Sequence, residues 1–389
     1  MLVYNNCIGS GGESVEKYIY SGQKKLRCGY TTGTCAASAA KASAMLLLSG
    51  QIPSEVMLKL PSGEQITIEV SSVLKNEATA VSSVVKDSGD DPDVTNGIII
   101  FAEVSLSSEG IEILGGEGIG TVTKPGLDQP VGAAAINSVP RRMIAQAVTE
   151  TAEKYGYTGG FRIVISAPGG EELAKKTFNP RMGIEGGISI IGTTGIVEPM
   201  SQRALVETIR AEASMRRAAG HEYLLLTVGN YSEDFIKLKN GTLADRAVTC
   251  SNYIGEALDI AVSLGFKGVL LVGHIGKLVK LGSGIMNTHS GYADGRMETL
   301  IACGVLAGAE SGVLAGLAGC VTTDAAIEML EEHGAADKTL RVLTERVGYY
   351  LDCRVRSSIE TGAVIFSQKQ GLELMTSRAS ELMEHISEE

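Results

Sequence analysis

The chain has 389 residues, of which 44% are hydrophobic and 20% charged, and it carries a formal net charge of −11. This composition is typical of a globular protein, and the length exceeds the size at which a single core stops growing, so two domains are expected. The acidic balance argues against nucleic acid or an anionic membrane surface as a partner. Any anion site must therefore be a local basic cluster.

The cysteines form no Cys-x-x-Cys pair, so neither a structural zinc site nor a disulfide framework is indicated. We expect most of them to be small buried apolar residues in a reducing compartment. The chain opens with no secretory signal pattern and has no apolar run long enough to span a membrane, which predicts a cytoplasmic protein. The cysteines are Cys7, Cys28, Cys35, Cys250, Cys303, Cys320 and Cys353.

The most informative segment is LRCGYTTGTCAASAAK, residues 26–41. An alanine-rich stretch follows the turn Thr31-Thr32-Gly33-Thr34, which predicts a helix that starts at this turn. The unpaired amides and partial positive charge of a helix start attract anions, and the threonine hydroxyls can donate to a carboxylate or phosphate. The alternative is a threonine N-cap on a well-packed helix. The segment alone leaves both interpretations open.

The first part of the chain has the pattern of an α+β domain. Several segments alternate apolar and polar residues with period two, which predicts strands. An acidic turn, DSGDDPD, joins two of them, a glycine-rich loop follows, and VPRRMIAQAVTETAEKYG predicts an amphipathic helix opened by Pro140. We expect residues 1–156 to form a mixed or antiparallel sheet with helices. The strands are expected at 55–60, 65–70, 78–87 and 97–106.

The second part has the pattern of an α/β domain. Short continuous apolar runs followed by glycine suit parallel strands buried on both faces, and helical stretches lie between them. We therefore expect residues 157–389 to form a doubly wound, mostly parallel sheet, with alanine-rich helices after Asp294. The strands are expected at 161–168, 187–192, 223–229, 268–274 and near 363–368, and helices at 201–219, 251–264 and 277–286.

The predicted strand ends of this second domain all contain glycine. In open α/β sheets, ligands bind beyond the carboxyl ends of the strands, so glycine at every end favours a nucleoside-sized ligand lying across them. A glycine that merely turns the chain is the alternative at any single position. The predicted cofactor-binding residues are Gly192, Thr193, Thr194, Gly195, Gly229, Asn230 and Gly273.

Basic residues beside glycine or proline predict a site for a ligand with several carboxylates. Arg141 and Arg142 directly follow Pro140, which would place two guanidinium groups on the first turn of a helix, where they can bind carboxylates in bidentate fashion. Salt bridges to the 45 acidic residues are the alternative. The predicted substrate-binding residues are Thr31, Thr32, Thr34, Lys124, Arg141, Arg142, Arg181, Lys277, His289, Asp294 and Arg296.

Two glycine motifs fall short of nucleotide-binding signatures. Residues 116–120, GEGIG, lack the third glycine of the dinucleotide fingerprint, and in residues 170–177 Lys175 replaces a P-loop glycine while Pro180 would end the required helix. His274 and His289 share a glycine-rich stretch but are too few for a metal site, so no protein-bound metal is expected. His274 and Glu117 are the candidate catalytic groups, as an acid/base or a hydrogen-bond partner.

Five strings between Leu26 and Met297 give the chain a family resemblance. They are GYTTGTCAA, GGEGIGTVTKPGL, AINSVPRRMI, SAPGGEELAKKTFNPRMGIEGGISIIGTTGIVEPMS and VGHIGKLVKLGSGIMNTHSGYADGRME. Together they resemble the cobalt-precorrin-5B C1-methyltransferase family, CbiD, of anaerobic cobalamin biosynthesis. The resemblance implies that S-adenosyl-L-methionine methylates C1 of a cobalt-containing tetrapyrrole, and that cobalt arrives inside the substrate. We expect the first domain on the substrate side and the second on the cofactor side.

Two functions of other classes stay open from the residues alone. A nucleotide-dependent kinase or ATPase would release or transfer phosphate, and a non-catalytic carrier of a corrinoid intermediate would bind the tetrapyrrole but not the cofactor. The sequence also leaves open a homo-oligomer and channelling of the intermediate to neighbouring pathway enzymes.

Overall fold

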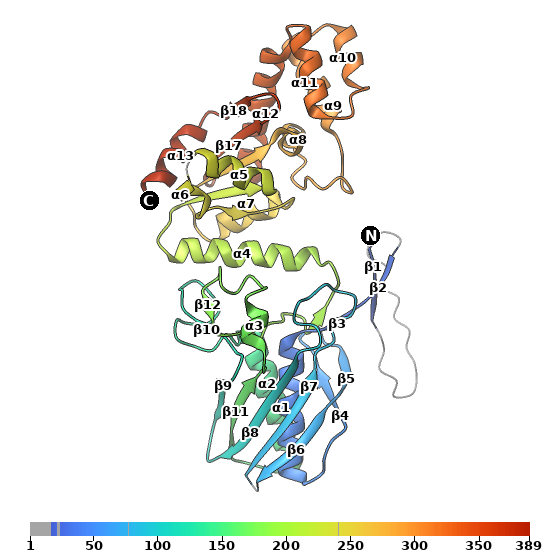
Figure 1. Ribbon diagram of the computed structural model, residues 1–389, viewed down its shortest axis with the longest axis vertical. Coiled ribbons are helices and arrows are strands. Elements are labelled where there is room, and N and C mark those ends of the chain that lie inside the picture. The colour runs from blue at the N-terminus through green and yellow to red at the C-terminus, as the bar shows by residue number, and fades with distance from the viewer. Residues whose placement is uncertain (1–16, 22–23, 77, 240) are drawn as a thin grey trace. The chain divides into compact units, whose positions relative to one another are not determined.

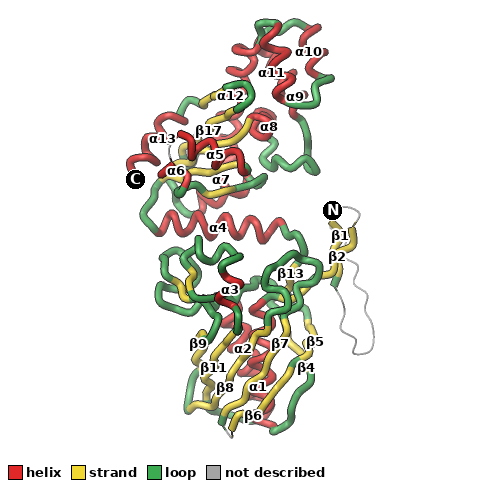
Figure 2. Tube along the Cα trace, in the orientation of Figure 1, coloured by secondary structure: helices red, strands yellow, loops and turns green. Residues whose placement is uncertain are grey.

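The computed structural model describes residues 17–21, 24–76, 78–239 and 241–389 (Figure 1). They belong to two compact units, one ending at Gln202 and the other beginning at Arg203. Both units combine helices with β-sheets (Figure 2). The expected fold class, a mixed sheet with helices followed by a mostly parallel sheet, is confirmed.

The first unit is built around one five-stranded sheet. Its helices are α1 (Thr32–Ser49), α2 (Ser138–Tyr155) and α3 (Gly170–Ala174). Its strands are β1 (Tyr18–Ser21), β2 (Lys24–Arg27), β3 (Gly29–Tyr30), β4 (Glu55–Lys59), β5 (Gln65–Glu69), β6 (Ser71–Asn76), β7 (Thr79–Val85), β8 (Ile99–Ser107), β9 (Ile111–Gly115), β10 (Thr121–Val122), β11 (Gly160–Ser166), β12 (Ile184–Glu185) and β13 (Ile196–Val197).

The strands of the main sheet follow the order β6-β7-β8-β11-β9. All neighbours are antiparallel except β11 and β9, which are parallel. The segment 161–168, expected to open the parallel sheet, instead pairs along β8. A continuous apolar run indicates that a strand is buried on both faces, but it does not indicate which strand pairs with it. The boundary between the units consequently lies at 202/203 and differs from the expected 156/157.

Helix α1 packs closely against α2, β7 and β8 because its side chains are small. Its alanines from Ala36 to Ala44 have no exposed surface, and at Gly33 a Cβ would lie 2.7 Å from Pro140 Cγ of α2. The hydroxyl of Thr31 accepts the amide N–H of Thr34 at 3.2 Å, and Gly50 ends the helix with φ 71°. The helix therefore has a threonine N-cap and a left-handed glycine C-cap.

The second unit is a doubly wound sheet covered by helices. Its strands are β14 (Tyr223–Val228), β15 (Val248–Thr249), β16 (Gly268–His274), β17 (Glu360–Ser367) and β18 (Leu372–Met375). Its helices are α4 (Gln202–Ala218), α5 (Asn230–Lys239), α6 (Gly241–Ala244), α7 (Ile254–Ser263), α8 (Ile275–Leu278), the 3₁₀ helix η1 (Val279–Ser283), α9 (Arg296–Ala307), α10 (Ser311–Leu317), α11 (Thr323–Glu332), α12 (Ala336–Val355) and α13 (Ala379–Glu388).

This sheet has the strand order β15-β14-β16-β17-β18, parallel throughout except for β18. Alternate residues of β14 face opposite sides, as strand geometry requires. Leu224 and Leu226 join a core with α7 and α12, whereas Leu225 joins a second core with α5 and α13. Both faces are covered, which explains the continuous apolar runs.

The expected helix over 277–286 is replaced by α8 and η1, and the helix α5 was not expected. The expected strand over 187–192 forms only isolated bridges, one of them between Ile119 and Ile188.

Six cysteines are free, and Cys7 lies outside the described residues. Burial raises the pKa of both Cys35 and Cys250 to about 12. Within the described ranges, the helices that are long enough to cross a bilayer are not apolar enough to do so.

Candidate functional site

The strand order of the second unit reverses between β14 and β16. From β14 the chain crosses to β15 on one side and then to β16 on the other. The crevice outside the carboxyl ends at such a reversal is where open parallel sheets bind ligands. Gly229 and Asn230 follow β14, and Gly273 and His274 end β16. The structure thus brings these predicted residues together at one edge of one sheet.

The two glycines at these strand ends lack side chains for different reasons. Gly229 has φ +79°, and a Cβ there would lie 3.3 Å from Nζ of Lys277, so its backbone borders a charged group. A Cβ on Gly273 would lie 2.7 Å from Cγ of Leu278, so this glycine permits the packing of α8 and is not open to a ligand. Asn230 begins α5, which places the N-terminus of that helix at the same strand end.

Lys277 carries its ammonium to the end of β14. Its Nζ donates to Oδ1 of Asn252 at 3.0 Å, and the same oxygen accepts the hydroxyl of Thr288 at 3.1 Å. Burial lowers the pKa of Lys277, while Cys250 acts in the opposite direction. No carboxylate of the described chain forms an ion pair with this half-buried amine.

His274 combines a structural contact with a free ring edge. Its Nδ1 accepts the amide N–H of Gly276 at 3.1 Å and so caps α8. Its ring lies edge-on to Phe366 with centroids 5.6 Å apart, and 6.3 Å from the ring of Tyr231. Because Nδ1 is an acceptor, the proton of the neutral imidazole belongs to Nε2. This tautomer makes His274 a hydrogen-bond donor and leaves it no free basic nitrogen.

A carboxylate lies beside the same edge on residues that the sequence did not indicate. The hydroxyl of Thr249, at the end of β15, donates to Oε1 of Glu233 at 2.7 Å. Oγ1 of Thr249 lies 3.2 Å from Oγ1 of Thr227, the buried neighbour on β14. Glu233 lies in the first turn of α5, where the helix dipole stabilises an anion. Only the short spacing between the strand end and this glutamate could have signalled it.

The loop between η1 and α9 is held by protein contacts. Nζ of Lys280 donates to the carbonyls of Thr288 and Ala293 at 3.1 and 2.8 Å. The predicted substrate residues Asp294 and Arg296 bind each other, with Nη2 to Oδ2 at 3.0 Å, so they largely neutralise one another. His289 is exposed and its Nδ1 accepts the amide of Gly291 at 3.0 Å. The described residues contain no group of three His, Cys, Asp or Glu side chains placed to hold a metal ion.

The threonine turn of the first unit binds protein groups, so the structure gives no support to the prediction that Thr31, Thr32 and Thr34 contact substrate. The hydroxyl of Thr32 accepts the amide of Ile191 at 2.9 Å, and that of Thr34 donates to the carbonyl of Gly195 at 2.7 Å. Thr31, Thr32 and Thr34 are each at most 9% exposed. Their hydroxyls complete the start of α1 and are not presented to a ligand.

The segment Gly192-Thr193-Thr194-Gly195 also belongs to the first unit, so it does not end a strand of the parallel sheet as predicted. A Cβ on Gly192 would lie 2.2 Å from Oγ1 of Thr31. Thr194 bonds within its own turn, and Thr193 is exposed. The glycines allow this segment to approach the helix start, which is a packing requirement and gives no support for cofactor contact.

The predicted basic residues of the first unit differ in whether their side chains are bound to protein groups or exposed to solvent. Nε and Nη1 of Arg141 donate to the carbonyls of Ile136 and Ile113 at 2.8 and 2.9 Å, so Arg141 is committed to the fold. Burial lowers its pKa, against a smaller opposite effect of Asp128. The remaining predicted side chains of this unit are exposed: Lys124, Arg142, Arg181 and the candidate catalytic Glu117.

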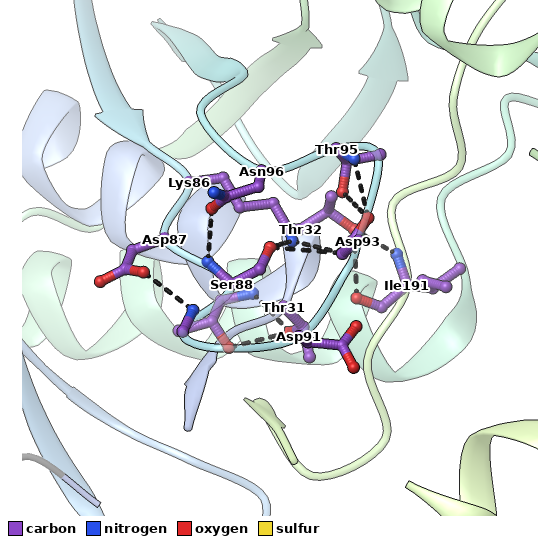
Figure 3. Close-up of polar contacts among 12 residues, drawn as sticks. Thr31, Thr32, Lys86, Asp87, Ser88, Asp91, Asp93, Thr95, Asn96 and Ile191 are labelled. Atoms are coloured by element: carbon purple, nitrogen blue, oxygen red, sulfur yellow. Dashed lines mark hydrogen bonds and ion pairs between the residues drawn. The ribbon is translucent and has the colours of Figure 1, made fainter. Parts of the chain in front are cut away.

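A buried lysine lies under the acidic turn, and the sequence did not single it out (Figure 3). Lys86 is 2% exposed, and its Nζ contacts Oγ of Ser88 and Oδ2 of Asp93, the latter at 2.6 Å. Asp87 forms a bidentate pair with Arg27 at 2.6 and 2.8 Å. The amide of Met200 donates to Asp91 at 2.9 Å. The turn therefore binds two distant segments, those of Arg27 and Met200. Its run of aspartates was the available signal in the sequence.

Comparison with known proteins places the chain in a family. The CbiD family model matches residues 19–199, in the first unit, and that of the CbiD C-terminal domain matches residues 287–377, in the second. A relative from Ruminiclostridium cellulolyticum named cobalt-precorrin-5B C(1)-methyltransferase is 47% identical over 91% of this chain and 92% of its own.

Relatives of the same name give the same picture. That from Photorhabdus laumondii is 45% identical over 90% of this chain and 92% of its own, and that from Alkaliphilus metalliredigens is 40% identical over 96% and 99%. A crystal structure of the cobalamin biosynthesis protein CbiD from Archaeoglobus fulgidus matches with 31% identity and a TM-score of 0.39, covering 71% of this chain and 86% of that one. The two family models and the relatives of 40–47% identity show that the chain belongs to the CbiD family.

Proposed function

We propose that this chain is a cobalt-precorrin-5B C1-methyltransferase that uses S-adenosyl-L-methionine as methyl donor. The observation that carries the proposal is 40–47% identity, over at least 90% of the chain, to relatives that bear this name. The match extends over at least 92% of each relative's length, so we propose the complete activity of these relatives for this chain.

The edge at β14 and β16 has polar groups that suit S-adenosylmethionine, which supports placing the methyl donor there. The amine of Lys277 suits a carboxylate, the Glu233 carboxylate suits hydroxyl or ammonium groups, and Gly229 lets the ligand approach the backbone. When bound, S-adenosylmethionine supplies an electrophilic methyl group on a sulfonium centre. The residues of this edge fit that group, and their task is to bind and orient it.

The chain's own contribution to methyl transfer is positioning and exclusion of water. Holding two reactants in line at near-attack distance supplies most of the acceleration of such a displacement. Asn252 fixes Lys277, and the cap to Gly276 fixes the ring of His274 with Nε2–H on its free edge. We assign His274 to hydrogen-bond donation at this edge, since its other nitrogen is engaged. For a catalytic role of Glu117, the structure offers one supporting fact, which is that the side chain is exposed.

The acidic side chains of the tetrapyrrole are assigned to the exposed cations of the first unit. Lys124, Arg142 and Arg181 have solvent-facing side chains, whereas Arg141 and the threonine turn are committed to protein groups. Cobalt is part of the substrate in this reaction. The proposal also places the protein in the cytoplasm, where its six described free cysteines would stay reduced.

A kinase or ATPase has little structural support. The P-loop-like stretch forms the short helix α3, and the lysine that stands for the P-loop glycine, Lys175, pairs with Glu172 at 2.5 Å on the surface. In a phosphate-binding loop a glycine at this position lets the backbone N–H groups cradle the phosphates, and Lys175 takes its place here. The corrinoid-carrier alternative differs from the enzyme in one property, the binding of the methyl donor.

The decisive experiment is incubation of the purified protein with cobalt-precorrin-5B and S-adenosylmethionine under anaerobic conditions. We expect a tetrapyrrole product heavier by one methyl group and stoichiometric S-adenosylhomocysteine, both read by mass spectrometry. Thermal stabilisation by S-adenosylhomocysteine but not by ATP is expected in parallel. Binding of the tetrapyrrole without methyl transfer would favour the carrier, and phosphate release would favour the ATPase.

A further inference from the structure

The amine of Lys277 lies at the switch-point edge, the carboxyl ends of β14 and β16, and no carboxylate of the described residues forms an ion pair with it. Within the described residues, its hydrogen-bond acceptor is the neutral amide oxygen of Asn252, at 3.0 Å. A lysine ammonium has three N–H donors, so two are available to a ligand. Half-burial of a cation without a counter-charge is unfavourable, and a bound anion would relieve it.

The position of this amine is determined by neighbours on both sides. On one side a Cβ on Gly229 would come within 3.3 Å of Nζ, so the glycine leaves room beside the charge. On the other, Asn252 is held by the hydroxyl of Thr288 and gives its own carbonyl to the amide of Thr288 at 3.1 Å. Lys277 is therefore preorganised at the end of β14.

The space at Gly229 favours a slim anion. A single half-buried amine beside backbone suits a ligand with one carboxylate, whereas the several acidic side chains of the tetrapyrrole are better matched by several exposed cations. The β14–β16 reversal is also where a nucleoside-bearing ligand is expected to lie. Both considerations assign Lys277 to the methyl donor and not to the tetrapyrrole.

We propose that Lys277, oriented by Asn252, binds the amino-acid carboxylate of the methyl donor and so selects donors that carry it. This inference rests on the proposed function, because it takes S-adenosylmethionine as the donor. It makes Lys277 a specificity-determining residue for one end of the cofactor. It also separates Lys277 from the substrate-binding residues with which the sequence grouped it.

The test is a ligand-by-variant cycle measured by isothermal titration calorimetry without tetrapyrrole. The ligands are S-adenosylhomocysteine and its decarboxylated analogue, and the variants are Lys277→Met, Lys277→Arg and, as a matched control, Lys237→Met on the exposed face of α5. A hydrogen-bonded charge pair of this kind is worth about 10- to 100-fold in affinity. We expect the wild type and K237M to prefer S-adenosylhomocysteine by about that factor.

K277M should lose this preference while binding the decarboxylated analogue as the wild type does, which also shows that the variant is folded. K277R should keep part of the preference because it keeps the charge. An undiminished preference in K277M would overturn the assignment of Lys277 alone. A wild-type protein that binds neither ligand would overturn the donor itself, and with it this inference.

Discussion

The buried pair between Lys86 and Asp93 allows a prediction about which partner is more costly to remove. Lys86 has a side chain 2% exposed, whereas that of Asp93 is 25% exposed, and Nζ and Oδ2 are 2.6 Å apart. Removal of one partner of a buried pair costs about 3–5 kcal/mol because the other charge is left without compensation. The cost should therefore depend on which charge is left behind.

Asp93→Asn leaves the lysine, the more deeply buried group, so we expect it to destabilise the first unit by about 3–5 kcal/mol. Lys86→Met leaves a carboxylate that water reaches in part. Its Oδ1 still accepts the amide and hydroxyl of Thr95 at 2.8 and 2.7 Å, so we expect a smaller loss, about 1–3 kcal/mol. The double variant, which removes both charges, should be more stable than D93N.

The assay must resolve the first unit from the second. The chain has no tryptophan, and with two units a single unfolding free energy is not well defined. Hydrogen exchange of the amides of Lys86 and Gly97, which bond to the carbonyls of Ile98 and Lys86 at 2.8 Å each, reports the affected hairpin directly. A K86M protein that opens as easily as D93N, or a double variant less stable than D93N, would refute the reasoning.

Three further outcomes follow from the same contacts. Burial acts to raise the pKa of Asp93, but Lys86 and Thr95 outweigh it and hold that pKa below its ordinary value. The ionised carboxylate therefore stabilises the folded state above pH ~4, and this stabilisation is lost as the pH falls through the folded-state pKa. Protection of the Lys86 and Gly97 amides from hydrogen exchange, measured between pH 3 and 6 and corrected for the intrinsic exchange rate, should show this loss in the wild type and not in D93N. Arg141→Ala should destabilise the first unit by about 1–3 kcal/mol because it frees two carbonyls. Arg142→Ala, the matched control, should not, and weaker substrate binding by R141A at unchanged stability would contradict this. His274→Asn keeps an N-cap for α8 but loses the Nε2–H donor. Turnover should therefore fall by ~10²-fold with the fold intact, as for loss of a preorganised hydrogen-bond donor; full turnover would reduce His274 to a cap.

The switch-point edge was predictable because its signals are local. Continuous apolar runs followed by glycine located β14 and β16, and the strand ends then placed Gly229 and His274 at one edge. The N-cap at Thr31 was also one of two stated interpretations, since capping depends on neighbours three residues away. Glu233 and Asn252 were missed because nothing in a single sequence relates a residue on one connection to the end of another strand.

The contacts that the sequence did not predict join residues that lie far apart along the chain. Thr34 bonds to Gly195, 161 positions away, so the sequence could not show that its hydroxyl was already engaged. Periodicity identified residues 161–168 as a buried strand, but pairing with β8 depends on tertiary packing. The two carbonyls that occupy Arg141 likewise come from separate segments. Patterns along a chain report burial and local geometry, and partners at long range are decided by the fold.

The contact between the threonine turn and residues 191–195 has a consequence for synthesis on the ribosome. Helix α1 forms from residues made early, yet its first turn acquires its partners at Ile191 and Gly195 only after most of the first unit has been translated. Pairing of β13 with β3 has the same delay. Such long-range closure slows folding and leaves early segments exposed to aggregation. A nascent chain arrested before residue 190 should be protease-sensitive near the turn, and one extended well past Gln202 should be protected there.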